Sequence, residues 1–150
     1  MKVISLWQPF AQLIVLGEKQ YETRSWCTNH RGKLLIHASL TPYKNVEKDI
    51  CRDAKIMINR YLSEHGLLPE ELIKGAIVGC VEITDCIMMD DEMINMQISP
   101  KEYYLGDWAA GRYAWKVENP VMFRKPIMVK GNQGLWNYNI DLEEVMNLGK

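Results

Sequence analysis

Hydrophobic positions in the first quarter of the chain predict a strand, a short helix and two further strands. The apolar run over residues 3–6 is typical of a short strand. Residues 8–16 open on Gln-Pro and end before Gly17, a pattern that predicts a short buried helix closed by a glycine cap. Residues 21–26 alternate in polarity and predict an extended segment, and the apolar run over residues 34–38 predicts a buried strand.

The longest periodic pattern lies over residues 43–64 and predicts a single amphipathic helix. Residues 69–73 look like one more helical turn, closed by Gly75. Residues 76–85 are rich in β-branched and small apolar residues and form the strongest strand candidate. The apolar stripe of the helix predicted over residues 43–64 consists of Val46, Ile50, Ala54, Met57, Ile58, Tyr61 and Leu62.

The second half of the chain has weaker patterns. The acidic, methionine-rich residues 88–96 predict a loop or an irregular helix. Residues 113–117, 121–123 and 127–129 predict three short strands, interrupted at Pro120 and Pro126, and residues 142–148 predict a closing helix. Several short strands with one long helix indicate an α+β fold.

Composition narrows the class of protein. The 150 residues, 47% of them hydrophobic, suffice for one globular domain, and the net charge of −1 excludes binding of nucleic acid by overall charge. Residues 1–60 nevertheless carry 10 basic against 5 acidic side chains, so a polyanion is expected to approach this part of the chain. Four unclustered cysteines suggest reduced thiols in a cytoplasmic protein without a structural metal or other cofactor. No apolar run is long enough for a membrane span, so no membrane partner is expected.

The segment 17–26 concentrates charged and aromatic side chains directly after the first predicted helix. In an extended chain alternate side chains share a face, so Glu22, Arg24 and Trp26 should project together. With Lys19 as a further cation, this surface offers an ion pair and a stacking plane suited to a nucleotide. The alternative is an ordinary ion pair beside a core tryptophan, worth about 0–1 kcal/mol.

The order Gly17-x-Lys19-x-x-Glu22-x-Arg24 resembles the G-x-K-x-x-E-x-R signature of the ASCH domain family. The resemblance continues over residues 5–11, 31–39, 75–83, 111–115 and 130–136, and so covers nearly the whole chain. It implies a small twisted β-barrel of the PUA-like superfamily with flanking helices. Residues 1–150 would form a single ASCH domain with a helical insert at about residues 43–73.

The resemblance also implies a function, because PUA-like relatives bind RNA and some hold a modified base. RNA, or a nucleoside or nucleotide, is therefore the expected partner. The alternatives are a hydrolase acting on RNA phosphodiester bonds or on N4-acylated cytidine, with Lys19 and Glu22 as the acid–base pair, and a protein-interaction module using the methionine-rich segment. Amidohydrolase-type ASCH proteins carry a hydroxyl residue in place of Glu22. The candidate ligand-binding residues are Trp7, Lys19, Glu22, Arg24, Trp26, Arg31, His37, Gln133 and Trp136.

Overall fold

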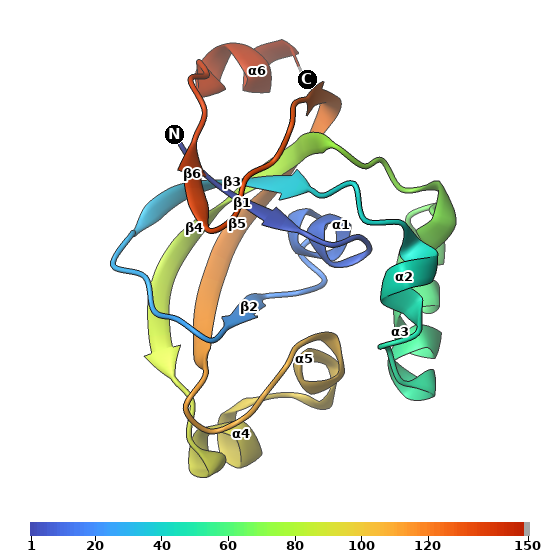
Figure 1. Ribbon diagram of the computed structural model, residues 1–150, viewed down its shortest axis with the longest axis vertical. Coiled ribbons are helices and arrows are strands. Elements are labelled where there is room, and N and C mark those ends of the chain that lie inside the picture. The colour runs from blue at the N-terminus through green and yellow to red at the C-terminus, as the bar shows by residue number, and fades with distance from the viewer. Residues whose placement is uncertain (149–150) are drawn as a thin grey trace.

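The computed structural model describes residues 1–148 and shows one curled, mixed six-stranded sheet with helices around it (Figure 1). The strand order is β2-β5-β4-β3-β1-β6. Strands β1 and β3 run parallel, and the other neighbours are antiparallel. The strands are β1 (Lys2–Leu6), β2 (Tyr21–Arg24), β3 (Gly32–Ala38), β4 (Ala76–Met88), β5 (Tyr113–Met128) and β6 (Leu135–Asn137). The predicted α+β class is confirmed.

The two long strands β4 and β5 give the sheet its curl. The prediction of three short strands over residues 113–129 is wrong, because β5 is continuous from Tyr113 to Met128. Its pairing with β4 shifts register near both prolines. Between the pair Cys80–Val121 and the pair Glu82–Glu118, for example, β5 contains one residue more than β4. The prolines thus lie in bulges, where a missing N–H interrupts no regular ladder. Strand β4 also runs three residues beyond the predicted end at residue 85.

Side-chain alternation along the strands divides the core between the two faces of the sheet. Leu34 and Ile36 of β3 pack with Ile14 of the short helix α1 (Phe10–Val15), which lies on the concave side (Figure 1). Leu35 points to the other face, where it packs in a cluster with Trp136. Residues of helix α6 (Leu142–Leu148) pack against this second cluster, and the bounds of α6 agree with the prediction.

The predicted single helix over residues 43–64 is wrong in one respect, since the structure divides it into α2 (Tyr43–Glu47) and α3 (Arg52–Glu64). Between them, the backbone N–H groups of Asp49 and Ile50 donate to carbonyls three residues earlier, and Cys51 is extended. The apolar period continues across this turn, so the pattern could not reveal it. Helix α3 then packs Ile58 and Leu62 against Leu13 of α1.

The segment between β4 and β5 forms two short helices, α4 (Asp91–Gln97) and α5 (Pro100–Leu105). The side chain of Asp90 accepts a hydrogen bond from the Met93 backbone and caps α4, which replaces the predicted loop or irregular helix. Met93 and Met89 are buried with Trp108. A 3₁₀ turn, η1 (Pro69–Glu71), lies within the predicted helical turn. Among the described residues, no helix is long and apolar enough to cross a bilayer.

Candidate functional site

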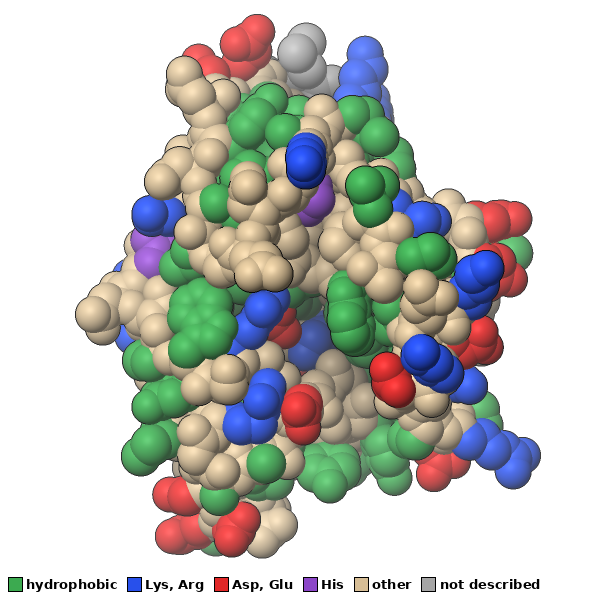
Figure 2. All heavy atoms as spheres, viewed as in Figure 1, with side chains coloured by type: hydrophobic (Ala, Val, Ile, Leu, Met, Phe, Trp, Pro, Cys, Tyr) green, Lys and Arg blue, Asp and Glu red, His purple; other side chains and the backbone are tan. Residues whose placement is uncertain are grey.

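A cleft of about 960 Å³ opens between the curled sheet and the helices α3 and α5. Figure 2 shows it as a hollow at the centre of one face, with positive and negative side chains together in its depth and apolar side chains on either side. Four stretches of chain line it: the β1–α1 junction, residues 19–26, the turn between α2 and α3, and α5 with the loop after it. The lining includes Trp7, Phe10, Lys19, Glu22, Thr23, Arg24, Trp26, Asp49, Ile50, Cys51, Tyr103, Tyr104, Asp107 and Arg112.

Lys19 lies in the cleft because the end of α1 turns the chain back sharply. Gly17 has φ +81°, a conformation that glycine adopts without strain, and the backbone N–H groups of Glu18 and Lys19 both donate to the carbonyl of Leu13. The Lys19 side chain is only 2% exposed, and its Nζ donates to the Tyr21 carbonyl. Burial lowers the pKa of this ammonium group, against the opposing attraction of Glu22 and Glu102. Lys19 therefore loses a proton more readily than an ordinary lysine.

Glu22 and Arg24 form an ion pair along the edge strand β2, with Arg24 Nη2 3.2 Å from Glu22 Oε2. The other carboxylate oxygen accepts from the Thr23 backbone, and Arg24 Nη2 also donates to the Ser5 carbonyl. The predicted sharing of one face by Glu22 and Arg24 is confirmed. The arginine side chain is 27% exposed, and within the described residues its Nη1 and Nε donate to no partner. Those donors remain available to a ligand.

Aromatic side chains stand on both sides of the ion pair. Trp7 lines the cleft with 49% of its surface exposed. Trp26 packs edge-to-face on buried Trp115, with ring centroids 4.8 Å apart, and Trp115 Nε1 donates to the Trp26 carbonyl. Tyr103 and Tyr104 of α5 are exposed and also line the cleft, although the sequence did not single them out. The cleft therefore offers stacking surfaces from three separate stretches of chain.

Glu102 is a buried carboxylate that the sequence prediction missed. It is 6% exposed, and one of its oxygens accepts from the Gln20 backbone at 2.6 Å. The other oxygen has no hydrogen-bond partner among residues 1–148. Burial raises its pKa, opposed by that hydrogen bond and by the charge of Lys19. The order Ser99-x-x-Glu102 is a capping-box sequence that predicts a helix start, and the Ser99 hydroxyl does accept from the Glu102 backbone. The glutamate side chain turns to Gln20 instead of completing the box.

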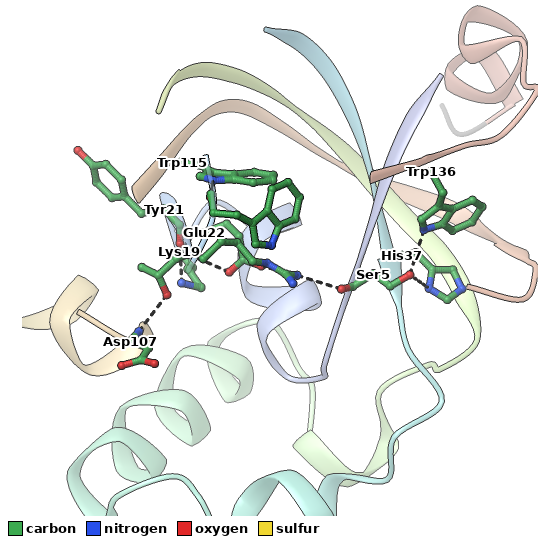
Figure 3. Close-up of polar contacts among 11 residues, drawn as sticks. Ser5, Lys19, Tyr21, Glu22, His37, Asp107, Trp115 and Trp136 are labelled. Atoms are coloured by element: carbon green, nitrogen blue, oxygen red, sulfur yellow. Dashed lines mark hydrogen bonds and ion pairs between the residues drawn. The ribbon is translucent and has the colours of Figure 1, made fainter. Parts of the chain in front are cut away.

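Four of the candidate residues lie outside the cleft lining. His37 is buried beside β1, where Nδ1 lies 3.0 Å from the Ser5 hydroxyl (Figure 3). Its Nε2 lies 2.7 Å from the Val129 carbonyl. A carbonyl only accepts, so Nε2 carries a proton, and burial lowers the pKa of the ring, which favours its neutral form. Trp136 donates to the same Ser5 hydroxyl. Gln133 is exposed near β6, and Arg31 lies beside Asp85 at 4.0 Å.

The charges that line the cleft balance one another. Three cations, Lys19, Arg24 and Arg112, face three carboxylates, and Arg112 contacts one of these, Asp107, at 3.6 Å. Lys33, one of the basic residues of the segment 1–60, is paired with Glu82 at 2.9 Å on the sheet. Within the part of the chain that the structure describes, no group of three or more His, Cys, Asp or Glu side chains could hold a metal ion.

Comparisons with known proteins agree with this architecture. The model of the ASCH domain family matches residues 4–127. Activating signal cointegrator 1 of Mus musculus and of Homo sapiens are 24% and 25% identical over 142 residues, which are 94% of this chain but 23% of theirs. The chain thus spans less than a quarter of the length of these relatives.

Solved structures resemble the whole chain. ASCH from Zymomonas mobilis superposes with a TM-score of 0.55 at 17% identity, covering 98% of this chain and 92% of that one. A single-residue variant of the same protein gives 0.58 at 16% identity, covering 99% and 96%. Identities this low show a shared fold and leave the ligand to be argued from the cleft.

Proposed function

Because the chain belongs to the ASCH domain family, we propose that it binds RNA by holding one nucleobase in the cleft around Lys19, Glu22 and Arg24. The observation that carries this proposal is the partly exposed Arg24 edge, fixed by Glu22 between exposed aromatic side chains. A protein recognises a base through hydrogen-bonding groups opposite the edge of the base and flat side chains against its faces, and the cleft supplies both.

The hydrogen-bonding groups suit a base that carries both a donor and an acceptor. Arg24 has two unused donor nitrogens, and the Glu22 carboxylate can accept from an exocyclic amino group in addition to its present partners. Their mutual ion pair holds both groups before a ligand arrives, which reduces the entropy lost on binding. Lys19 supplies one more polar atom at the floor.

The size and charge of the cleft also favour a base over a run of phosphates. A volume of about 960 Å³ lies at the upper end of the range of small-molecule sites, roughly 300–1,000 Å³. It admits a nucleoside, which would stack on the aromatic side chains of the lining. Three cations balanced by three carboxylates give little net attraction for a polyanion. A base inserted from a single-stranded segment satisfies both conditions.

The test is a binding titration of single-stranded RNA and of free nucleosides against the wild type, Arg24→Ala and Trp7→Ala. We expect each substitution to weaken binding at least tenfold, while the melting temperature stays within a few degrees of the wild type. Arg60→Ala, which removes an exposed arginine paired with Glu64 outside the cleft, is the matched control and should bind as the wild type does. Unchanged affinity in a folded Arg24→Ala variant would show that the ion pair is structural only.

A second candidate function, hydrolysis, is favoured by the burial of Lys19. A lysine of lowered pKa yields a neutral amine that can act as a base or nucleophile, with Glu22 as its acidic partner. Glu22 stands where amidohydrolase-type relatives have a hydroxyl, which favours the phosphodiester over the N4-acyl substrate. Turnover of single-stranded RNA and of N4-acetylcytidine by the wild type and by Lys19→Met decides the matter. Binding without product formation rejects hydrolysis and leaves the binding proposal intact.

A further inference from the structure

Two thiol groups from distant parts of the sequence meet beside one wall of the cleft. Cys27 follows β2 and is exposed, Cys86 lies on β4 and is half-buried, and their sulfur atoms are 3.3 Å apart. Cys51 is exposed on the other side of the cleft, and Cys80 is buried in the sheet. The pair is therefore both close and reachable from solvent.

We propose that Cys27 and Cys86 are a modification site that reacts with hydrogen peroxide to form a reversible disulfide. A disulfide bond is about 2.05 Å long, so the two sulfur atoms need to approach by only a little more than 1 Å. Cys27 lies in a loop at the surface, where rotation of its side chain disturbs no core packing. The chemistry does not depend on the function proposed for the cleft.

The surroundings assign the two cysteines different parts in the reaction. Exposed Cys27 is the sulfur that a peroxide can reach, whereas burial raises the pKa of the Cys86 thiol. The neighbouring Arg31 guanidinium opposes this effect at Cys86. Arg31 is fixed by donating to the carbonyls of Thr28 and His30. The loop thus holds Cys27 and a cation beside Cys86.

The reaction consumes one peroxide. The Cys27 thiolate attacks the O–O bond, forming a sulfenic acid and releasing hydroxide, which takes up a proton to become water. The Cys86 sulfur then attacks the Cys27 sulfur and expels a second hydroxide, which leaves as water with the Cys86 proton. Two thiols lose two electrons and the peroxide is reduced to two waters. An added thiol reductant reverses the bond by disulfide exchange.

A bond at Cys27 also acts on the wall of the cleft, because Trp26 is the preceding residue. The Trp26 carbonyl is already tied to Trp115 on β5, and Trp115 pairs across the sheet with Cys86 on β4. The disulfide adds a second attachment of the Trp26 segment to the same place in the sheet. We expect oxidation to restrict Trp26 and to change its fluorescence.

The experiment treats the reduced protein with equimolar hydrogen peroxide, then counts free thiols after denaturation and maps cross-linked peptides by mass spectrometry. We expect the four thiols of the wild type to fall to two, with one intramolecular cross-link between the peptides of Cys27 and Cys86, and full recovery with dithiothreitol. Cys51→Ser should still lose two thiols. Cys86→Ser should instead gain oxygen mass at Cys27.

Three results would overturn the inference. These are the absence of the cross-linked peptide from the treated wild type, thiol loss only in dimers joined through Cys51, and oxygen gain at Cys27 that is as fast in the wild type as in Cys86→Ser. Each of these outcomes would mean that the two sulfurs do not react with one another. None of them bears on RNA binding, so failure here and failure of the proposed function are distinguishable.

Discussion

Lys19 keeps its ammonium group where water hardly reaches it, and this burial has a consequence for stability. Its pKa in the folded protein is lowered from the ordinary value of 10.5, mainly by desolvation. Between the lowered pKa and 10.5 the unfolded chain binds more protons than the folded one, so stability increases with pH in that window. Each unit of lowering corresponds to about 1.4 kcal/mol.

Comparison with Lys19→Met, which keeps an apolar stem of similar length, isolates this contribution. We expect the free energy of unfolding of the wild type to rise relative to that of the variant as the pH increases from neutrality towards 10.5. Urea denaturation of both proteins at several pH values measures the difference. A difference that stays constant with pH would show that the folded protein does not disfavour the charged lysine.

His37 makes the stability of the protein depend on pH at the acidic end of the range. Its pKa is lowered by burial, and its neutral ring accepts from Ser5 while donating to Val129. Protonation would turn the accepting nitrogen into a donor and remove the hydrogen bond from Ser5. Because the folded-state pKa lies below the unfolded value of 6.5, the unfolded chain binds more protons as the pH falls through this range, and stability is lost.

We expect His37→Gln to be less stable than the wild type at pH 7 by about 1–3 kcal/mol, owing to lost hydrogen bonds. The deficit should shrink as the pH is lowered from 7 to 5, because only the wild type pays for protonating this ring. Chemical denaturation across that range provides the measurement. A deficit that grows on acidification would mean that the folded protein prefers the charged imidazole.

Among the elements, β4 and β5 depend on a close approach at Gly79. A Cβ atom added there would lie 2.2 Å from the Val121 carbonyl oxygen and 2.7 Å from a methyl group of Val15. The first of these is backbone, so relief requires β5 or α1 to move. We expect Gly79→Ala to lower the free energy of unfolding by about 1–3 kcal/mol through overpacking.

Thr84→Ala is the matched control for this strand, because Thr84 lies exposed on β4 outside the contact with α1. It should change stability by about 0.5 kcal/mol or less, as surface substitutions usually do. Thermal unfolding of both variants compares the two positions. Equal melting temperatures would show that the sheet accommodates a methyl group at Gly79.

The sequence predicted elements well where local chemistry decides them and poorly where tertiary contacts do. Gly17 predicted the end of α1, and side-chain parity along β2 brought Glu22 and Arg24 together. The prolines of β5 led to the prediction of separate short strands. A proline in a bulge and a proline at a strand end look alike until the register with β4 is known. The turn after α2 contains no glycine or proline and keeps the apolar period, so it left no signal.

The candidate site shows the same division. The motif residues on one short stretch of chain meet as predicted, since their spacing follows from the strand itself. Tyr103, Tyr104 and Glu102 reach the same region from a helix about eighty positions later in the sequence, and only the packing of α5 beside β2 brings them there. His37 and Trp136 converge on Ser5 behind the sheet, so their chemistry serves the core.

For the whole molecule, the distribution of charge determines how RNA binding should respond to salt. The net charge is −1, the cleft lining is balanced, and α4 carries acidic residues that repel a polyanion. Figure 2 shows acidic side chains gathered at the lower end of the molecule, where Figure 1 places α4. A strand bound through one base can therefore bring few of its phosphates close to cations.

Each phosphate neutralised on a single strand contributes about −0.7 to the slope of log K against log salt concentration. We expect one or two such contacts, and hence a slope between about −0.7 and −1.4, together with binding that survives moderate salt. Titrations of a single-stranded RNA between low and physiological salt measure this slope. If it is as steep as about −4, the strand follows a track of cations along the surface, and a base held in the cleft no longer accounts for the affinity.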